Sequence, residues 1–232
     1  PISKAQASCV GIRAAPICAS IGLLITFSLM IWYDYARPWK KHQNEFTLLE
    51  VKRTELEIEE ALGKVDVLLV THGHWDHITD APALAKLNKI PLHAPGDLNN
   101  ALTTLGVLPA EQLPRFNKSG RLSPVPGIHF TAVRAEHSSI YVWRNPATGK
   151  DETHPGGEPM GYIIQMENGF KIWHMGDTGL FGDMKWIAEH YKPDVVMMPI
   201  GGRFTMDAAD ADYALRDLIK PKFAIPMHYR VM

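Results

Sequence analysis

Cysteine is scarce in this chain, and an excess of basic charge is missing. Only two cysteines occur in 232 residues, Cys9 and Cys18, so a framework of several disulfides is excluded and the redox compartment is not fixed. Lysine and arginine number 24 against 25 acidic residues, and the formal net charge of −1 provides no general attraction to a polyanion. We therefore expect no nucleic-acid partner. Internal repeats and low-complexity tracts are also absent, and with 46% hydrophobic residues the chain can bury one sizeable core.

Histidine, by contrast, is abundant, with eleven residues. Three of them and one aspartate fall within the six residues "HGHWDH", His72–His77. Random placement at this composition gives roughly 0.001 occurrences of that spacing. Imidazole and carboxylate suit borderline cations such as Zn²⁺, and catalytic sites leave one coordination position open for water. The segment therefore predicts a metal site, and the lack of a neighbouring cysteine argues against a closed structural zinc site.

The histidine-rich segment is expected to form a loop between a strand, Val65–Val70, and a helix that begins at Asp80. An acidic helix is expected before it, from Thr54 to Gly63. Further strands are expected at 128–137, 161–177, 194–202 and 222–228, with a two-residue hairpin turn at Asn168–Gly169. Helices are expected at Met184–Tyr191 and Asp207–Ile219, whereas Trp143–Pro159 is typical of a long loop. This order of elements predicts an α/β domain.

Three of the expected strands end in a residue that can bind a metal, namely His137, Asp177 and His228. In layered α/β architectures the functional side chains gather at strand ends, on loops that a rigid sheet holds in place. These three residues can therefore join the four candidates of the "HGHWDH" segment at one edge of the fold.

Taken together, "THGHWDH", "AEHSS", "HMGDTGLFGDM", "PIGGRFTMDAADA" and "IPMHY" resemble the metallo-β-lactamase fold superfamily, and more narrowly its small metal-dependent hydrolases of the ascorbate-6-phosphate lactonase branch. The resemblance covers about residues 64–229. It implies a four-layer αββα sandwich with two divalent metal ions per chain, zinc being the expected metal and manganese or iron the alternatives. It also implies the ligands: His72, His74 and His137 for the first metal, Asp76, His77 and His228 for the second, and Asp177 as the bridge.

The activity that the resemblance implies is hydrolysis of a small ester, lactone or phosphoester by a metal-bridging hydroxide. Asp76 would be the catalytic residue that orients the nucleophile or shuttles its proton. Two alternatives belong to the same superfamily, a thioester hydrolase and a mononuclear iron dioxygenase. A third is a non-catalytic or partner-dependent metal-binding protein. An RNA-processing nuclease is disfavoured, because the near-neutral charge offers nothing to hold a phosphate backbone.

Three further residues are candidates for contact with the small-molecule substrate. Ser138 and Tyr141 follow His137 closely, and Arg203 can bind an anionic group through its fork of donors. A surface role is the alternative for Arg203. His174 is expected to pack in the core or to support a metal ligand rather than to bind metal itself.

The resemblance leads us to expect a strand pair within residues 1–50. The sequence of that part does not show one. Ala14–Tyr33 is instead a run of twenty residues without a charge, long enough to span a bilayer. It is interpreted as a signal or anchor, as buried core strands, or as the product of an altered start. The first interpretation predicts a membrane-anchored or exported protein and the others a cytoplasmic one.

We expect an atypical N-terminal part, 1–50, and a metallo-hydrolase domain, 51–232, with a shortened C-terminal part after His228. Because the flanking parts differ from the resemblance, sheet edges would be left uncovered. A homo-oligomer or another partner is one expected way to cover them.

Overall fold

The computed structural model describes residues 65–229, together with Thr26, Glu45, Leu48, Leu49 and Lys52. It divides into two compact units, Pro1–Glu60 and Ala61–Met232, and all the elements below belong to the second. The expected helix at 54–63 and the apolar run at 14–33, apart from Thr26, lie outside the described residues. Among the residues that are described, no helix is long and apolar enough to cross a membrane. The division of the chain at residue 50 stays a prediction.

A small parallel sheet begins the described unit. Its strands, in spatial order, are β1 (Leu68–Leu69), β2 (Leu92–Pro95) and β3 (Arg115–Phe116). Helices α3 (Trp75–Ile78) and α4 (Ala81–Asn88) connect β1 to β2, and α5 (Gly96–Thr104) and the 3₁₀ turn η1 (Ala110–Gln112) connect β2 to β3. Parallel neighbours need such crossovers, and residues of these helices pack with Leu92 and Ala94 of β2 in one core cluster.

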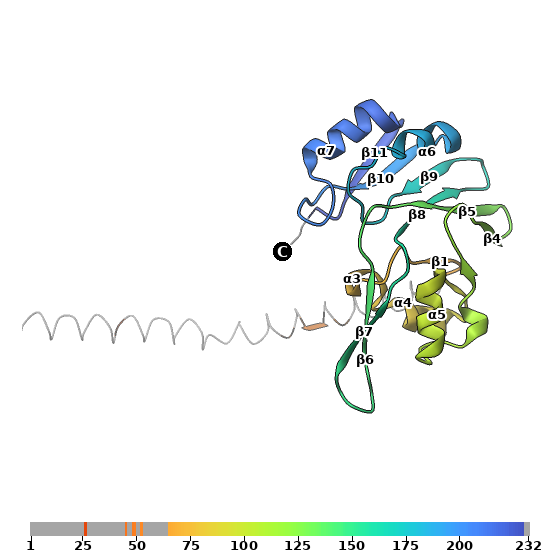
Figure 1. Ribbon diagram of the computed structural model, residues 1–232, viewed down its shortest axis with the longest axis vertical. Coiled ribbons are helices and arrows are strands. Elements are labelled where there is room, and N and C mark those ends of the chain that lie inside the picture. Colours follow the sequence, from red (N-terminus) through yellow and green to blue (C-terminus); the bar gives the residue numbers. More distant parts are fainter. Residues whose placement is uncertain (1–25, 27–44, 46–47, 50–51, 53–64, 230–232) are drawn as a thin grey trace, which may run out of the picture. The chain divides into compact units, whose positions relative to one another are not determined.

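A larger sheet of six strands follows, in the spatial order β11-β10-β9-β8-β5-β4. The strands are β4 (Arg121–Val125), β5 (Ile128–Arg134), β8 (Met160–Gln165), β9 (Lys171–His174), β10 (Val195–Pro199) and β11 (Phe223–Met227). The strands from β4 to β9 pair antiparallel, whereas β9, β10 and β11 are parallel. Helix α6 (Met184–Tyr191), helix α7 (Ala208–Tyr213) and the π-helical segment η2 (Ala214–Ile219) connect the parallel strands. A separate hairpin, β6 (Ile140–Arg144) with β7 (Asp151–Pro155), projects from the unit (Figure 1).

The two sheets and the helices form four layers, because side chains alternate between the two faces of each strand and both faces are packed. In β5, Phe130 and Ala132 face one way and pack with Val67 and Leu69 of the small sheet, so this core cluster lies between the two sheets. Val133 of the same strand faces the other way, into a cluster with residues of α6, α7 and η2. A third cluster packs the small sheet against α4 and α5. The layers therefore run helix, sheet, sheet, helix, as expected from the sequence.

Most elements agree with the sequence analysis. Helix α6 has the expected bounds, α4 begins after Asp80, and strands form within each expected range. The β8–β9 hairpin is also confirmed, but its turn is longer than two residues. Gln165 pairs with Lys171, and the Met166 N–H donates to the Phe170 carbonyl at 2.8 Å, so the turn comprises residues 167–169. Its last residue, Gly169, has φ +82°, which glycine adopts without strain.

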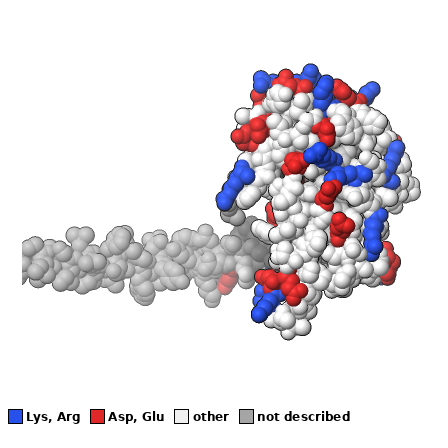
Figure 2. All heavy atoms as spheres, viewed as in Figure 1, with Lys and Arg blue, Asp and Glu red and all other residues white. Residues whose placement is uncertain are grey.

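The predicted loop Trp143–Pro159 was wrong at its start, where Trp143 and Arg144 end β6, and at Asp151–Pro155, which form β7. The two strands pair from Ile140–Pro155 to Arg144–Asp151. The segment is polar and mostly exposed, so no buried apolar face marked it as a strand. Cross-strand partners hold it instead, including the ion pair of Arg144 with Asp151 at 3.1 Å and the hydrogen bond from Asn145 Nδ2 to Glu152 at 2.7 Å. Figure 2 shows basic and acidic side chains interspersed over the visible face of the described unit.

Candidate metal centre

The histidine-rich segment is positioned by close backbone contacts. The Thr71 carbonyl accepts the Met160 N–H at 3.0 Å, and the Gly73 N–H donates to Ser139 Oγ at 3.0 Å. A Cβ atom on Gly73 would lie 3.0 Å from the Cα of Gly156, so a larger residue would push the segment out of place. The segment then forms one helical turn, α3, rather than the loop that we predicted throughout. Asp76 and His77 both lie on this turn.

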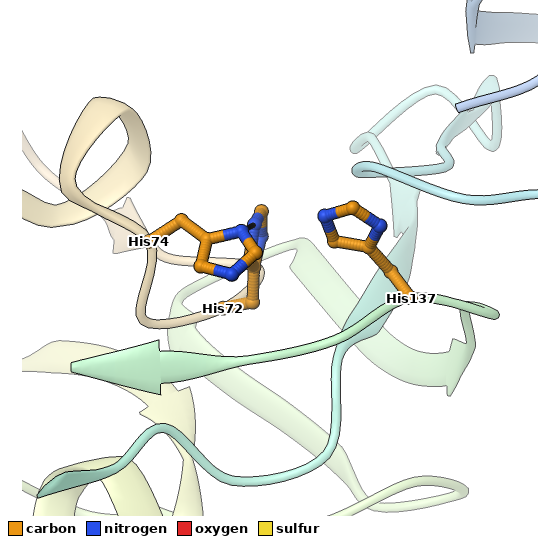
Figure 3. A group of neighbouring side chains, drawn as sticks. All are labelled: His72, His74 and His137. Carbon is orange, nitrogen blue, oxygen red and sulfur yellow. Dashed lines mark hydrogen bonds between the residues drawn. The ribbon is translucent and has the colours of Figure 1, made fainter. Parts of the chain in front are cut away.

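The first group of side chains comprises His72, His74 and His137, whose candidate ligand atoms all lie within 4.8 Å of one another. Figure 3 shows the three rings pointing toward one another, the first two from the segment after β1 and the third from the loop after β5. His72 Nε2 and His74 Nδ1 are 2.9 Å apart. The Thr71 hydroxyl lies 3.0 Å from His72 Nδ1 and so fixes the orientation of that ring.

The second group comprises Asp76, His77, Asp177 and His228, again with ligand atoms within 4.8 Å of one another. Asp76 Oδ2 lies 3.4 Å from Nε2 of both His77 and His228. Asp177 Oδ2 lies 3.3 Å from the same two nitrogens. His228 follows β11 with φ +49°, an uncommon conformation for a residue with a side chain. Strain of this kind clusters at functional sites, where the surrounding structure imposes it.

Asp177 connects the two groups. Its Oδ2 atom is 3.7 Å from His137 Nε2 of the first group as well as 3.3 Å from His77 and His228 of the second. The side chain is only 5% exposed, and its Oδ1 atom has no hydrogen-bond partner among the described residues. A buried carboxylate oxygen without a partner is costly, so a cation fits this position.

The protonation of the first group and of Asp177 also suits a cation. Burial lowers the pKa of His72 far below its ordinary range, with help from the charge of His77, and burial lowers the pKa of His74 and His137 as well. Burial alone would raise the pKa of Asp177, but contact with His77 lowers it overall. Near pH 7 the three imidazoles of the first group are neutral and Asp177 is anionic. These are the forms that bind metal ions.

The donor set therefore fits two divalent cations. Five imidazoles and two carboxylates converge from four strand ends, and His77 Nε2 and Asp177 Oδ1 are buried without hydrogen-bond partners among the described residues. Nitrogen and carboxylate oxygen donors are typical of Zn²⁺ and also accept Mn²⁺ or Fe²⁺. The seven predicted residues are thus brought together, and their roles as ligands stay predictions.

The three residues predicted to contact the substrate differ in their exposure to solvent. Ser138 is exposed directly after His137, whereas Tyr141 is buried at 8% exposure in the cluster that packs α4 and α5 on the small sheet. Arg203 is exposed, and its guanidinium lies 4.9 Å from the ring centre of Phe204. His174 is partly buried, and its Nδ1 accepts the Gly176 N–H at 3.2 Å, which agrees with the packing role expected for it. Only Ser138 and Arg203 are thus exposed enough to meet a substrate.

The residues that hold the ligands in place were not predicted from the sequence. Thr71 directly precedes His72 and Ser139 lies two residues after His137, and hydroxyl residues close to metal ligands are a usable signal for such support. Gly156 carried a weaker signal, a Gly-Gly pair in a stretch that was predicted as a loop. A cavity of about 370 Å³ also adjoins the second group, where Asp76 and His77 meet the apolar residues Leu69 and Leu84.

Comparison with known proteins identifies the family. The family model described as "Beta-lactamase superfamily domain" matches residues 45–229. The chain belongs to this family. A "UPF0173 metal-dependent hydrolase" from Polaromonas sp. (strain JS666 / ATCC BAA-500) is 64% identical over 192 residues, which cover 83% of this chain and 68% of that protein. Four further relatives of the same description are matched over 59–60% of their length. This chain is therefore a member of a family of metal-dependent hydrolases.

Solved structures agree on the fold. Igni18, "a novel metallo hydrolase from the hyperthermophilic archaeon Ignicoccus hospitalis KIN4/I", matches with a TM-score of 0.59 and 33% identity over 72% of this chain and 65% of that one. The "metallo-beta-lactamase fold protein YhfI from Bacillus subtilis" matches with a TM-score of 0.51 and 13% identity over the same shares of the two chains, which is evidence of fold alone. The expected metallo-β-lactamase-type fold is confirmed.

Proposed function

We propose that this protein is a dinuclear metal-dependent hydrolase that adds water to a small ester, lactone or phosphoester. The observation that carries the proposal is the pair of adjacent donor groups, with the buried carboxylate of Asp177 within 3.3–3.7 Å of nitrogens from both. His72, His74 and His137 would hold one cation and Asp76, His77 and His228 the other. A complete second group favours this function over a mononuclear iron dioxygenase, which needs one metal only.

The two cations would supply the Lewis acidity that activates water and polarises the bond to be cleaved. The protein residues supply position and proton transfer. Asp76 is the more exposed of the two carboxylates, with a side chain 38% exposed against 5% for Asp177, so it can reach a solvent proton. We assign to Asp76 the orientation of the attacking water and the removal of its proton. Asp177, in contrast, is enclosed and serves as a fixed anion between the groups.

The substrate class rests on two supports. The sequence resembles the ascorbate-6-phosphate lactonase branch, which favours a lactone or phosphoester. The cavity beside Asp76 and His77 has a volume of about 370 Å³, which suits a small molecule rather than a polymer. Arg203, exposed after β10, would bind an anionic group of that molecule, and Ser138 would contact it from the loop that carries His137. Zinc is the proposed metal, with manganese and iron to be tested alongside it.

The experiment that tests the proposal measures metal content and hydrolysis together on the purified chain. We expect about two metal ions per chain and turnover of at least one member of a panel of lactones, carboxylic esters and phosphoesters. Loss of a residue that only supports a ligand costs about 10–100-fold, so removal of a ligand should cost more than about 100-fold in kcat/KM. Asp76→Asn and Asp177→Asn are the variants to measure.

Asp212→Asn is the matched control, because Asp212 lies on α7 and forms an exposed ion pair with Arg216 at 2.7 Å. It should keep full activity. Undiminished turnover in both Asp76→Asn and Asp177→Asn would overturn the proposal. One iron per chain with oxygen consumption would favour the dioxygenase instead, and two metals without turnover of any ester, thioester or lactone would favour a binding protein.

A further inference from the structure

A second cavity lies on the large sheet, at the opposite end of β9 from the candidate metal centre. Its volume is about 310 Å³. Lys171 begins β9 and lines this cavity, whereas Asp177 follows the other end of the strand. The four residues of β9 span roughly 10 Å at the usual rise of a strand, and none of the seven candidate ligands lines the cavity. The cavity is therefore separate from the proposed hydrolytic site.

The sheet register places polar side chains on one face at this point. Arg121 of β4 pairs with Thr131 of β5, and two residues further along the sheet His129 pairs with Gln165, which in turn pairs with Lys171. Residues two apart on a strand face the same side, so all five side chains project from the same face. The five line the cavity together with Ser119, Ile163, His190 and Tyr191, of which the last two end α6.

The lining is rich in donors and basic groups. It includes the guanidinium of Arg121, the ammonium of Lys171, two imidazoles, two hydroxyl groups from Ser119 and Thr131, and the amide of Gln165. Among the described residues no Asp or Glu lines it. Arg121 is exposed and has no carboxylate within ion-pair distance in the described part of the chain. Such a set of donors without a counter-charge matches an anion with several oxygens.

The negative groups nearest to the cavity are already compensated. Asp194 accepts the backbone N–H of Lys171 at 3.0 Å, but its other oxygen pairs with Lys222 at 2.6 Å. The carbonyl end of α6 is also covered, because Lys171 Nζ donates to the Tyr191 carbonyl at 2.9 Å. An ammonium has three N–H donors, so two of those on Lys171 remain for a ligand. The cavity thus keeps its positive charge.

A wider hollow of about 610 Å³ adjoins this cavity and shares Ser119, His190 and Tyr191 with it. Its remaining lining residues are Trp186, which is 47% exposed, and Glu189, which pairs with Lys185 at 2.6 Å. A flat organic group can lie on the Trp186 ring there. The basic cavity would therefore take the anionic end of a ligand and the hollow its organic end.

We propose that the cavity between β4, β5, β8, β9 and the end of α6 is a binding site for a phosphate monoester. The phosphate lies among Arg121, Lys171 and His129, and the organic group extends toward Trp186. A phosphate group offers three peripheral oxygens, which match the several donors better than the two of a carboxylate. The site is independent of the hydrolytic function proposed above and needs no metal.

Calorimetric titration of the full chain with inorganic phosphate, at low ionic strength to limit screening, tests this proposal. Arg121→Gln and Lys171→Gln should each weaken phosphate binding about tenfold or more, since each removes hydrogen bonds between two charged groups. Arg144→Gln is the matched control, because Arg144 is exposed on β6 and pairs with Asp151. It should bind as the unmodified chain does.

Two further arms separate this site from the metal centre and from non-specific attraction. Phosphate binding should persist in Asp177→Asn, whose metal centre is disrupted. Phenyl phosphate should bind the unmodified chain more tightly than inorganic phosphate does, and Trp186→Ala should remove this difference. Phosphate binding that is absent, is lost only in Asp177→Asn, or is weakened equally by Arg144→Gln would overturn the proposal. Arg121 is exposed, so Arg121→Gln provides the decisive comparison even if Lys171→Gln fails to fold.

Discussion

His93 is a buried histidine that takes no part in the candidate metal centre. It lies in β2 at 5% exposure, with its ring centre 5.0 Å from that of Phe130 and 6.2 Å from that of Phe116. Its Nδ1 atom has no partner among the described residues. Burial lowers the pKa of His93 below its ordinary value of 6.5, because a charged ring between two phenyl rings loses its hydration. The folded state therefore favours the neutral ring.

This shift predicts the pH dependence of stability. The unfolded chain takes up a proton near pH 6.5 while the folded chain does not, so the contribution of His93 is complete above that pH and is lost as the pH falls below it. The loss is at most about 1.4 kcal/mol per pH unit for one group. Denaturation at about pH 7.5 and about pH 5.5 should show a smaller loss of unfolding free energy in His93→Leu than in the unmodified chain.

Several other histidines also have lowered pKa values. They remain in both proteins, so their contribution to the pH dependence cancels in the comparison. His190→Leu is the control, because His190 is exposed on α6. Equal losses in the unmodified chain and in His93→Leu would contradict the prediction.

At the scale of residues, the sequence predicted which side chains would converge but not which of them are enclosed. His72 and Asp177 could be predicted because their chemistry is specific and because strand ends meet at one edge. The burial of Tyr141 could not, since it depends on how β6 packs over the small sheet, and nothing local to "SSIYVW" fixes that. The Gly73 N–H donates to Ser139 Oγ across 66 positions of the chain, so a hydroxyl residue near a ligand could be noticed but its partner could not be predicted.

Among the helices, α7 has the clearest local determinant. Asp207 precedes it in extended conformation, and its side chain accepts the N–H groups of Ala209 at 2.8 Å and Asp210 at 2.9 Å. These bonds satisfy two of the four N–H groups that a helix leaves unpaired at its start. Asp207→Ala should lower the free energy of unfolding by about 1 kcal/mol, whereas Asp207→Asn should restore most of it. Chemical denaturation of the purified variants measures both.

Asp212→Ala is the control for α7, since it removes an exposed pair with Arg216 worth only about 0.3–0.5 kcal/mol. A loss in Asp207→Ala no larger than that of the control would show that the cap does not stabilise the helix.

Helices proved easier to predict than strands because their determinants are local. Asp207 and Pro193 mark helix limits within a few residues, whereas β7 exists only through its pairing with β6. The π-helical segment η2 was predicted as the second half of one helix, and its hydrogen-bond shift has no signature in "ALRDLI". The loop between β1 and α4 was predicted without its helical turn α3, because four residues are too few for a periodic pattern.

For the whole molecule, the layered fold and the metal centre depend on each other. The ligands come from segments that follow β1, β5, β9 and β11, so the two sheets must dock before the donors can meet. The order of layers was predicted from the family resemblance, whereas the recurrence of candidate ligands at strand ends predicted only that those ligands would converge. Cations that bind only the assembled donors must stabilise the folded state by mass action.

This coupling predicts the effect of metal on thermal stability. With zinc at about one hundred times its dissociation constant, one site contributes about 2.7 kcal/mol, and a domain of this size gains about 2–4 °C in Tm per kcal/mol. Chelation should therefore lower the Tm by about 5–10 °C per site. His137→Ala removes a donor from the first group only, so it should bind about one metal and keep about half of the shift. Asp177→Ala removes the carboxylate that lies between both groups and should lose most of it.

His154→Gln is the control that separates metal binding from the general effect of removing a histidine. His154 lies on β7, outside both donor groups, and its Nε2 is 3.7 Å from Glu152. It should show the full metal content and the full shift in Tm. If calorimetry with and without chelator gave the same shift for His137→Ala, Asp177→Ala and His154→Gln, the stabilising metal would bind elsewhere. A shift that falls in the order His154→Gln, His137→Ala, Asp177→Ala is the result expected if the two donor groups share Asp177, because His137 then controls one cation and Asp177 controls both.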